Sequence, residues 1–175
     1  MSPVPAAIFE DEMKVDKAVM QHLATALRME LTAVNQYLLH SHVLRDWGFD
    51  KLSGKMREEM SEEATHADLL IERILFHGGE PDLSSLDKVT ISETVPELLG
   101  KDLEGERAAR AAYAKAATDC EKAGDFVSRD LFVSLISDEE GHTEWLEKQL
   151  RLMKHLGEGI YLQSQMGAAG DENAE

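Results

Sequence analysis

The stretch Ser137-Asp138-Glu139-Glu140-Gly141-His142-Thr143-Glu144-Trp145 decides the fold, because it places a carboxylate and an imidazole on the apolar face of a helix. Residues three apart on a helix project from the same side, so Glu139 and His142 lie together. An unpaired carboxylate on a buried face is costly, and a cation is the partner that would compensate it. The neighbours at helical spacing are apolar, namely Phe132, Leu135, Leu146 and Met153.

A second Glu-x-x-His pair, Glu63 and His66, lies 76 residues before the first. The same offset relates Glu30 to Glu106 and Tyr37 to Tyr113. Each half of the chain thus carries a glutamate, a tyrosine seven residues later, and a Glu-x-x-His pair that begins 33 residues after the glutamate. This register indicates a twofold internal repeat of functional positions. It disfavours the alternative that these are solvated glutamates in a chain that is 30% charged.

The repeated residues predict a site for two metal ions. Four carboxylates facing one interior need about two divalent cations for neutrality, and carboxylate with imidazole but no thiolate favours iron or manganese over structural zinc. One Glu from each of two helices and a Glu-x-x-His from each of the other two is the donor set of di-iron carboxylate bundles. Tyr37 and Tyr113 are either core aromatics or hydrogen-bond partners of these ligands. The predicted ligands are Glu30, Glu63, His66, Glu106, Glu139 and His142.

Composition sets outer bounds on the protein. A chain of 175 residues that is 43% hydrophobic is expected to form a single domain, residues 1–175. The net charge of −16 disfavours nucleic acid or an anionic membrane as partner and favours cations. The single cysteine, Cys120, excludes disulfides within the chain and is expected in the core. Without an apolar run of about 18 residues or a secretory signal, a cytoplasmic protein without a membrane span is expected.

Apolar periodicity predicts four long helices over residues 16–47, 51–77, 95–123 and 126–156, so that the bundle occupies residues 14–156. Residues 80–94 form a long crossover between the second and third helices, expected to be fixed to the bundle by Leu83, Leu86, Val89 and Ile91. Gly124 and Asp125 form a tight link, which makes the third and fourth helices antiparallel. Residues 157–166 predict a short fifth helix that packs against neighbouring subunits. The tails, residues 1–13 and 167–175, are expected to be loose.

Over residues 16–165 the chain resembles the bacterioferritins, members of the ferritin superfamily. The resemblance rests on Glu30-Leu-Thr-Ala-Val-Asn-Gln-Tyr37, His66-Ala-Asp-Leu-Leu-Ile-Glu-Arg-Ile-Leu-Phe76, Phe126-Val-Ser-Arg-Asp130 and Asp138-Glu-Glu-Gly-His-Thr-Glu-Trp-Leu146. It implies an all-α, ferritin-like four-helix bundle with a short fifth helix, assembled from dimers into a hollow homo-oligomer of 24 subunits. It further implies that the six predicted ligands form a ferroxidase di-iron centre, with Glu63 and Glu139 as bridging carboxylates.

The chain departs from the resemblance at the haem ligand. In bacterioferritins the residue after the glutamate of the first Glu-x-x-His pair is a methionine that ligates haem at the dimer interface, and here that residue is Ala64. Met60 lies one helical turn earlier and is a weak substitute, because a helical methionine more often fills a core or an interface. We therefore expect no haem b bound in the usual way.

The resulting hypothesis is an iron-storing ferroxidase that oxidises Fe²⁺ with O₂ or H₂O₂ and holds the ferric mineral in a cage. One alternative is a di-iron or di-manganese peroxidase on the same bundle without storage. A second alternative is a shell subunit of a mixed, haem-containing bacterioferritin, with a haem-binding sister subunit. A ferredoxin-type reductant is the partner expected for iron release.

Overall fold

The computed structural model describes residues 15–167, which form five helices and no strand. They are α1 (Lys17–Asp46), α2 (Asp50–Phe76), α3 (Val95–Ala123), α4 (Phe126–Leu156) and α5 (Glu158–Gln165). Every predicted helix boundary is confirmed to within one residue. The predicted loose tails, residues 1–13 and 167–175, lie outside the described residues except for Gly167.

Local sequence signals explain where the long helices begin and end. The side chains of Asp16, Thr94 and Asp125 accept hydrogen bonds from the free backbone N–H groups at the starts of α1, α3 and α4. Gly124 closes α3 in the left-handed region with a φ of 76°, which a residue with a side chain rarely adopts. Because α4 starts two residues later, α3 and α4 form a tight antiparallel hairpin, as predicted.

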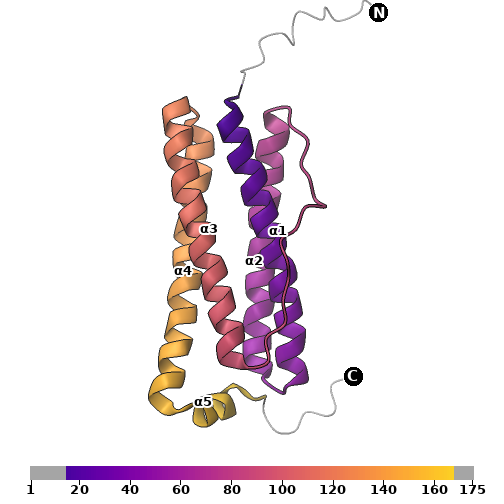
Figure 1. The fold of residues 1–175 in the computed structure, drawn as a ribbon, viewed down its shortest axis with the longest axis vertical. Helices are drawn as coiled ribbons and strands as arrows, with labels where there is room; N and C mark the ends of the chain where they lie inside the picture. Colours follow the sequence, from indigo (N-terminus) through magenta and orange to yellow (C-terminus); the bar gives the residue numbers. More distant parts are fainter. Residues whose placement is uncertain (1–14, 168–175) are drawn as a thin grey trace, which may run out of the picture.

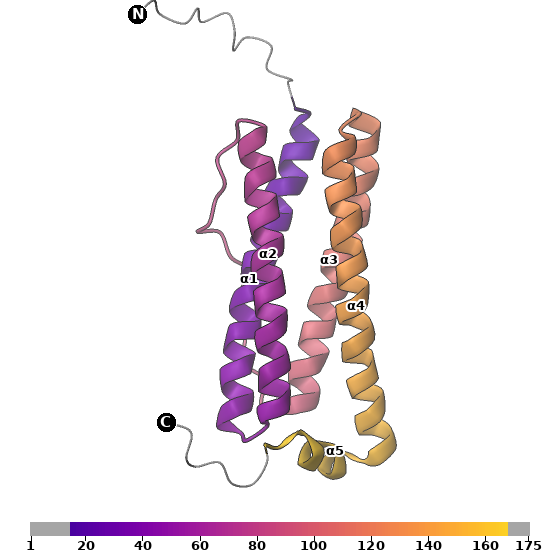
Figure 2. The same ribbon diagram turned by 180° about the vertical axis from the view of Figure 1, so that it is seen from behind.

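The four long helices form two antiparallel hairpins, α1–α2 and α3–α4, that lie side by side (Figures 1 and 2). The segment between α2 and α3 runs the length of the bundle beside α1 and delivers the chain to the opposite end (Figure 1). The short α5 lies across the end of the bundle at which α4 finishes (Figure 2). This arrangement confirms the predicted four-helix bundle with a long crossover and a short fifth helix.

The crossover is held on the bundle by polar contacts, and the prediction that its apolar side chains fix it is wrong for three of the four, since only Val89 is partly buried. Leu83, Leu86 and Ile91 are exposed. Gln36 on α1 donates to the Thr90 carbonyl (2.7 Å) and accepts from the Thr90 N–H (3.0 Å). Further along α1, the hydroxyl of Thr32 accepts from the Asp87 N–H at 2.9 Å, and the guanidinium of Arg28 pairs with the Asp87 carboxylate.

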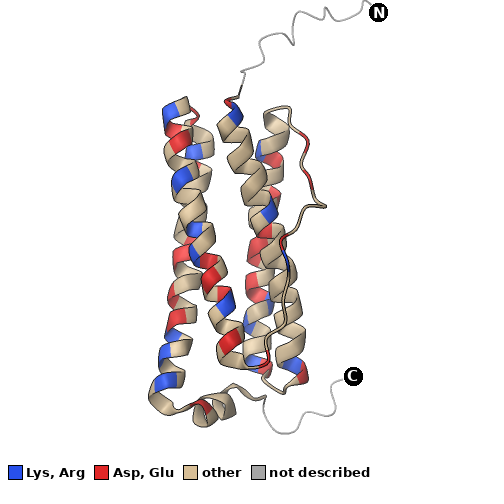
Figure 3. Cartoon of the chain, viewed as in Figure 1, with Lys and Arg blue, Asp and Glu red and all other residues tan. Residues whose placement is uncertain are grey.

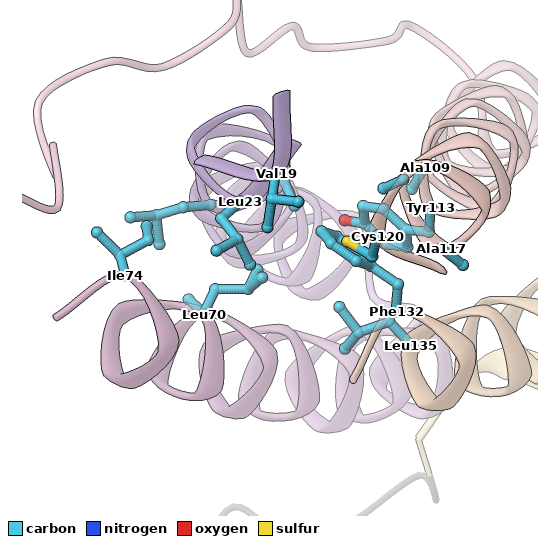
Figure 4. Packing of buried hydrophobic residues seen from close by; sticks show 14 residues of the cluster. Val19, Leu23, Leu70, Ile74, Ala109, Tyr113, Ala117, Cys120, Phe132 and Leu135 are labelled. Atoms are coloured by element: carbon cyan, nitrogen blue, oxygen red, sulfur yellow. The ribbon is translucent and has the colours of Figure 1, made fainter. Parts of the chain in front are cut away.

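The buried apolar residues form two separate clusters at the two ends of the bundle. The upper cluster lies toward the start of α1, where Leu23, Leu70 and Phe132 are fully buried, and Figure 4 shows how its side chains meet across the bundle. Cys120 belongs to this cluster and is buried, as expected. The lower cluster lies toward α5 and includes Leu44, Leu52 and Leu146. The middle of the bundle is left to polar side chains.

The fifth helix packs on its own subunit, a contact that the sequence did not predict. Tyr161 of α5 is 1% exposed, belongs to the lower cluster, and donates through its hydroxyl to Gln149 at 3.1 Å. Lys51 at the start of α2 donates to the Ser164 carbonyl at 2.7 Å. The neighbouring Ile160 is 64% exposed. The helix therefore closes one end of the bundle and leaves part of its apolar surface free.

Charged residues are distributed along the bundle. In the view of Figure 3, acidic and basic residues alternate along α3 and α4 rather than gathering at opposite ends. None of the helices in the described part of the chain combines the length and the apolar character needed to cross a lipid bilayer.

Candidate di-metal site

The six predicted ligands meet between the two apolar clusters, in the middle of the bundle. Their donor atoms form two groups, in each of which all atoms lie within 4.8 Å of one another. The first, here called the upper donor group, is Glu30, Glu63, His66 and Glu139; the second, the lower donor group, is Glu63, Glu106, Glu139 and His142. Each of the six side chains is at most 6% exposed. Glu63 and Glu139 belong to both groups, so the two groups share these two carboxylates.

Both imidazoles turn the same ring nitrogen toward the centre. Nδ1 of His66 lies 3.1 Å from Glu63 and 3.6 Å from Glu30. Nδ1 of His142 lies 3.2 Å from Glu63, 3.5 Å from Glu139 and 3.7 Å from Glu106. The sequence repeat is therefore a repeat in space, with each hairpin supplying one glutamate and one Glu-x-x-His pair to the same interior.

Several buried polar atoms at the centre have no hydrogen-bond partner in the described part of the protein. They are Glu63 Oε1, Glu139 Oε2, both ring nitrogens of His142 and both carboxylate oxygens of the adjacent Glu59. Buried polar atoms are almost always hydrogen-bonded in folded proteins, so unsatisfied oxygens and nitrogens at one point indicate a position for a bound ion. The six residues fit a pair of divalent cations, because their oxygen and imidazole donors suit iron or manganese.

The same crowding shifts the acid–base properties of the site. Burial, together with a neighbouring carboxyl group, raises the pKa of Glu30 to about 8 and that of Glu139 to about 10. Burial alone would lower the pKa of His66, but hydrogen bonding to Glu30 and Glu63 raises it to about 11. Without a metal ion these shifts favour the protonated forms of Glu30, Glu139 and His66.

Each of the outermost glutamates accepts a hydrogen bond from a buried tyrosine. The hydroxyl of Tyr37 donates to Glu106, and that of Tyr113 donates to Glu30. Each bond joins α1 to α3, so each tyrosine orients the carboxylate of the opposite hairpin. Burial and the nearby carboxylates raise the pKa of both phenols well above the ordinary value, which keeps them protonated donors. Both tyrosines also belong to the buried apolar clusters, so each is a core aromatic whose hydroxyl reaches a predicted ligand.

Three further carboxylates, which the sequence had not marked, face the outer nitrogens of the two imidazoles. Nε2 of His66 lies 3.3 Å from Asp138. Nε2 of His142 lies 2.9 Å from Glu59 and 3.4 Å from Glu62. Glu62 and Asp138 are also 76 residues apart, so the repeat itself contained the signal for these two. Glu59 has no such signal, and it is the most deeply buried of the three.

A buried histidine–aspartate pair lies one helical turn below the site. His40 and Asp102 are 0% and 5% exposed, and Nδ1 of His40 lies 2.9 Å from the Asp102 carboxylate. Nε2 of His40 faces the Thr90 carbonyl at 3.3 Å, which connects the pair to the crossover. Asp102 precedes the predicted ligand Glu106 by one turn of α3.

A cavity of about 260 Å³ opens beside the site between α1 and α3. Its wall includes both tyrosines and the four predicted ligand carboxylates. Its lining also includes the exposed Asp87 of the crossover and Lys101 of α3, together with the buried Asp102. The cavity therefore gives small ions and molecules access to the carboxylates from the side of the bundle that the crossover covers.

Comparison with known proteins agrees with this geometry. Residues 20–156 match the family model for the ferritin-like domain. The chain is 47% identical to a bacterioferritin of Brucella melitensis over 163 residues, covering 93% of this chain and all of that protein. It is 46% identical to a bacterial ferritin of Synechocystis over 88% of this chain and 99% of that protein.

A solved structure extends the similarity to three dimensions. The bacterioferritin of Rhodobacter capsulatus, a structure described as having a metal-free dinuclear site and a haem iron, superposes with a TM-score of 0.88. The two sequences are 43% identical, and the match covers 93% of this chain and all of the other. The chain therefore belongs to the bacterioferritins of the ferritin-like family.

Proposed function

We propose that the protein is an iron-storage subunit that oxidises Fe²⁺ at the six-residue site. The observation that carries the proposal is the pair of overlapping donor groups, which share the carboxylates of Glu63 and Glu139. Two iron ions held next to each other can each give one electron to O₂ or H₂O₂, and this redox chemistry belongs to the metal. The protein fixes the positions of the ions and balances their charge.

The residues divide this work by position. Glu63 and Glu139 would be shared by the two ions, because each carboxylate belongs to both donor groups. Glu30 with His66 completes the upper position, and Glu106 with His142 completes the lower one. Tyr37 and Tyr113 hold the outer carboxylates in place through their hydrogen bonds. With four carboxylates ionised, the ligands balance two divalent charges, so the protons of the empty site leave when Fe²⁺ binds.

Storage follows from the relatives and requires a closed shell. Relatives that match most of this chain are named bacterial ferritin or bacterioferritin, and iron storage is the function of such proteins. We infer a cytoplasmic cage of 24 identical subunits assembled from dimers, with a ferredoxin-type reductant for release. The exposed apolar residues at the free ends of the bundle, such as Phe76, Phe126 and Ile160, supply surface for subunit contacts. The peroxidase alternative predicts a small oligomer instead, which light scattering distinguishes from a shell.

We further propose that this subunit does not ligate haem by itself. Ala64 has no sulfur atom to offer. Met60, the weak substitute, is partly buried and packs against the lower cluster, so it fills space in its own subunit. A sister subunit with methionine at this position would be needed for a mixed, haem-containing shell.

The test of the proposed function is Fe²⁺ oxidation by the variants Glu63→Ala and Glu139→Ala. Because each carboxylate serves both ions, each substitution should remove the rapid phase of oxidation at two Fe²⁺ per subunit. Glu147→Ala is the matched control, since Glu147 lies on α4 and pairs only with the surface residues Arg107 and Arg151. Oxidation by either site variant at the wild-type rate would contradict the proposal.

A further inference from the structure

The internal repeat fails at two neighbouring positions of α2. Lys55 and Glu59, four residues apart, correspond through the offset of 76 residues to Leu131 and Leu135 of α4. Both leucines belong to the upper apolar cluster, Leu135 within it at 0% exposed and Leu131 packed against it. An ion pair thus stands on one side of the site where the repeat has an apolar pair on the other.

Glu59 is a buried carboxylate directed at a predicted metal ligand. It is 2% exposed, and its Oε2 lies 2.9 Å from Nε2 of His142. Lys55 pairs with its other oxygen, and the ammonium lies 5.5 Å from the centre of the Trp145 ring on α4. Lys55 thereby compensates the charge of Glu59 and fixes the direction of its carboxylate.

The two imidazoles therefore have different surroundings. The outer nitrogen of His66 lies 3.3 Å from Asp138, whose side chain is 39% exposed, and the other carboxylate near it is the exposed Glu62. The outer nitrogen of His142 faces the buried Glu59 in addition to Glu62, the repeat counterpart of Asp138. A carboxylate that accepts from the outer N–H of a metal-bound imidazole fixes the orientation of the ring and makes it a stronger ligand. A buried carboxylate does this better than an exposed one, because water competes less for it.

We propose that Glu59, held by Lys55, is a positioning residue that keeps Nδ1 of His142 directed into the lower donor group and makes the two metal positions inequivalent. The inference rests on the proposed di-metal function. Glu59 would set the metal affinity of the lower position, and Asp138 would set that of the upper position.

The experiment is a titration of metal-free protein with Co²⁺, followed by calorimetry and by the visible absorption of the bound ion. The wild type should bind two Co²⁺ per subunit. Glu59→Gln should lower the affinity for one of the two ions by about 10–100-fold and change the affinity for the other by no more than about threefold. Asp138→Asn should lower the affinity for the other ion. Glu59→Gln combined with Asp138→Asn should therefore lower both affinities.

A variant that restores the repeat separates positioning from folding. Lys55→Leu with Glu59→Leu gives α2 the pair that α4 carries, without leaving an unpaired buried charge. It should keep the wild-type helix content and assembly, yet lose affinity for the same single ion as Glu59→Gln. The inference is overturned if Glu59→Gln leaves both affinities unchanged, lowers both alike, or if the double leucine variant binds as the wild type does. A wild type that binds fewer than two Co²⁺ would overturn the proposed function, and the inference with it.

Discussion

Loading the site with metal should release about four protons per subunit at pH 7. Four of the six ligands have pKa values shifted toward the protonated form in the metal-free protein. Burial raises the pKa of Glu30 to about 8 and that of Glu139 to about 10. Hydrogen bonding to carboxylates outweighs burial at the imidazoles, raising the pKa of His66 to about 11 and that of His142 still further. Glu63, by contrast, has a lowered pKa, because the two neighbouring imidazoles favour its ionised form and outweigh the effect of burial.

The magnitude follows from competition between protons and metal for the same lone pairs. Four protons leave for two ions, so about two are lost per ion, and the affinity for each should fall about 100-fold when the pH drops from 7 to 6. The sign is fixed, because a raised pKa means that protons are held more tightly and metal binding weakens as the pH falls. With ordinary pKa values the glutamates would be ionised and the histidines mostly neutral, and fewer than about one proton would leave.

Calorimetric titration with Co²⁺ at pH 7 measures the proton number when it is repeated in two buffers of different ionisation enthalpy. Glu147→Ala serves as the control and should match the wild type, because its carboxylate lies outside the donor groups. Release of fewer than one proton per subunit would refute the reasoning, since the charges of the empty site would then be balanced by something other than protons.

Three further changes test the parts of the fold around the site. Tyr161→Ala should lower the free energy of unfolding by about 3–5 kcal/mol in urea denaturation, because Tyr161 belongs to the lower cluster. Gln163→Ala, a change at an exposed residue, should alter it by less than about 0.5 kcal/mol. Equal stability of the two variants would show that α5 does not complete the core. His40→Ala should lower the free energy of unfolding by about 3–5 kcal/mol in the same assay, because it leaves Asp102 buried without its partner. His42→Ala on the exposed side of α1 is the control. A loss no larger than that of the control would mean that the pair contributes little. Purified wild type should lack a strong Soret band after incubation with haemin, and Ala64→Met should restore one; a band of bis-methionine character in the wild type would show that Met60 or another residue supplies the ligand.

The sequence predicts the helices and the six ligands because both depend on short-range periodicity. Glu139 and His142 stand out as polar residues on an otherwise apolar helical face, and the offset to Glu63 and His66 repeats the signal. This pattern is visible within single helices, and the packing of the helices then brings the residues together. The helix ends were equally predictable, since Gly48, Gly124 and Gly157 all adopt positive φ where the helices stop.

What the sequence did not predict depends on contacts between helices. Glu59 is one glutamate among neighbours such as Glu58 and Glu62, and only the position of His142 on α4 shows that it is buried. His40 and Asp102 come from different helices and compensate each other, which no pattern within either helix reveals. The crossover was misjudged for the same reason, because its attachment depends on hydrogen bonds to α1 rather than on apolar burial.

The division of the core into two apolar clusters predicts where the metal-free subunit opens locally. Backbone amides usually exchange with solvent fastest at the ends of helices. Here both ends of the bundle are closed by apolar packing, and the middle holds buried ionisable groups that both hairpins contribute. Hydrogen exchange of the metal-free protein should therefore be unusually fast near the centres of the helices, and metal should slow it there most. The bound ions would then hold the two hairpins together in the middle of the bundle, where apolar packing is absent. The iron that the protein stores would thus also stabilise the subunit.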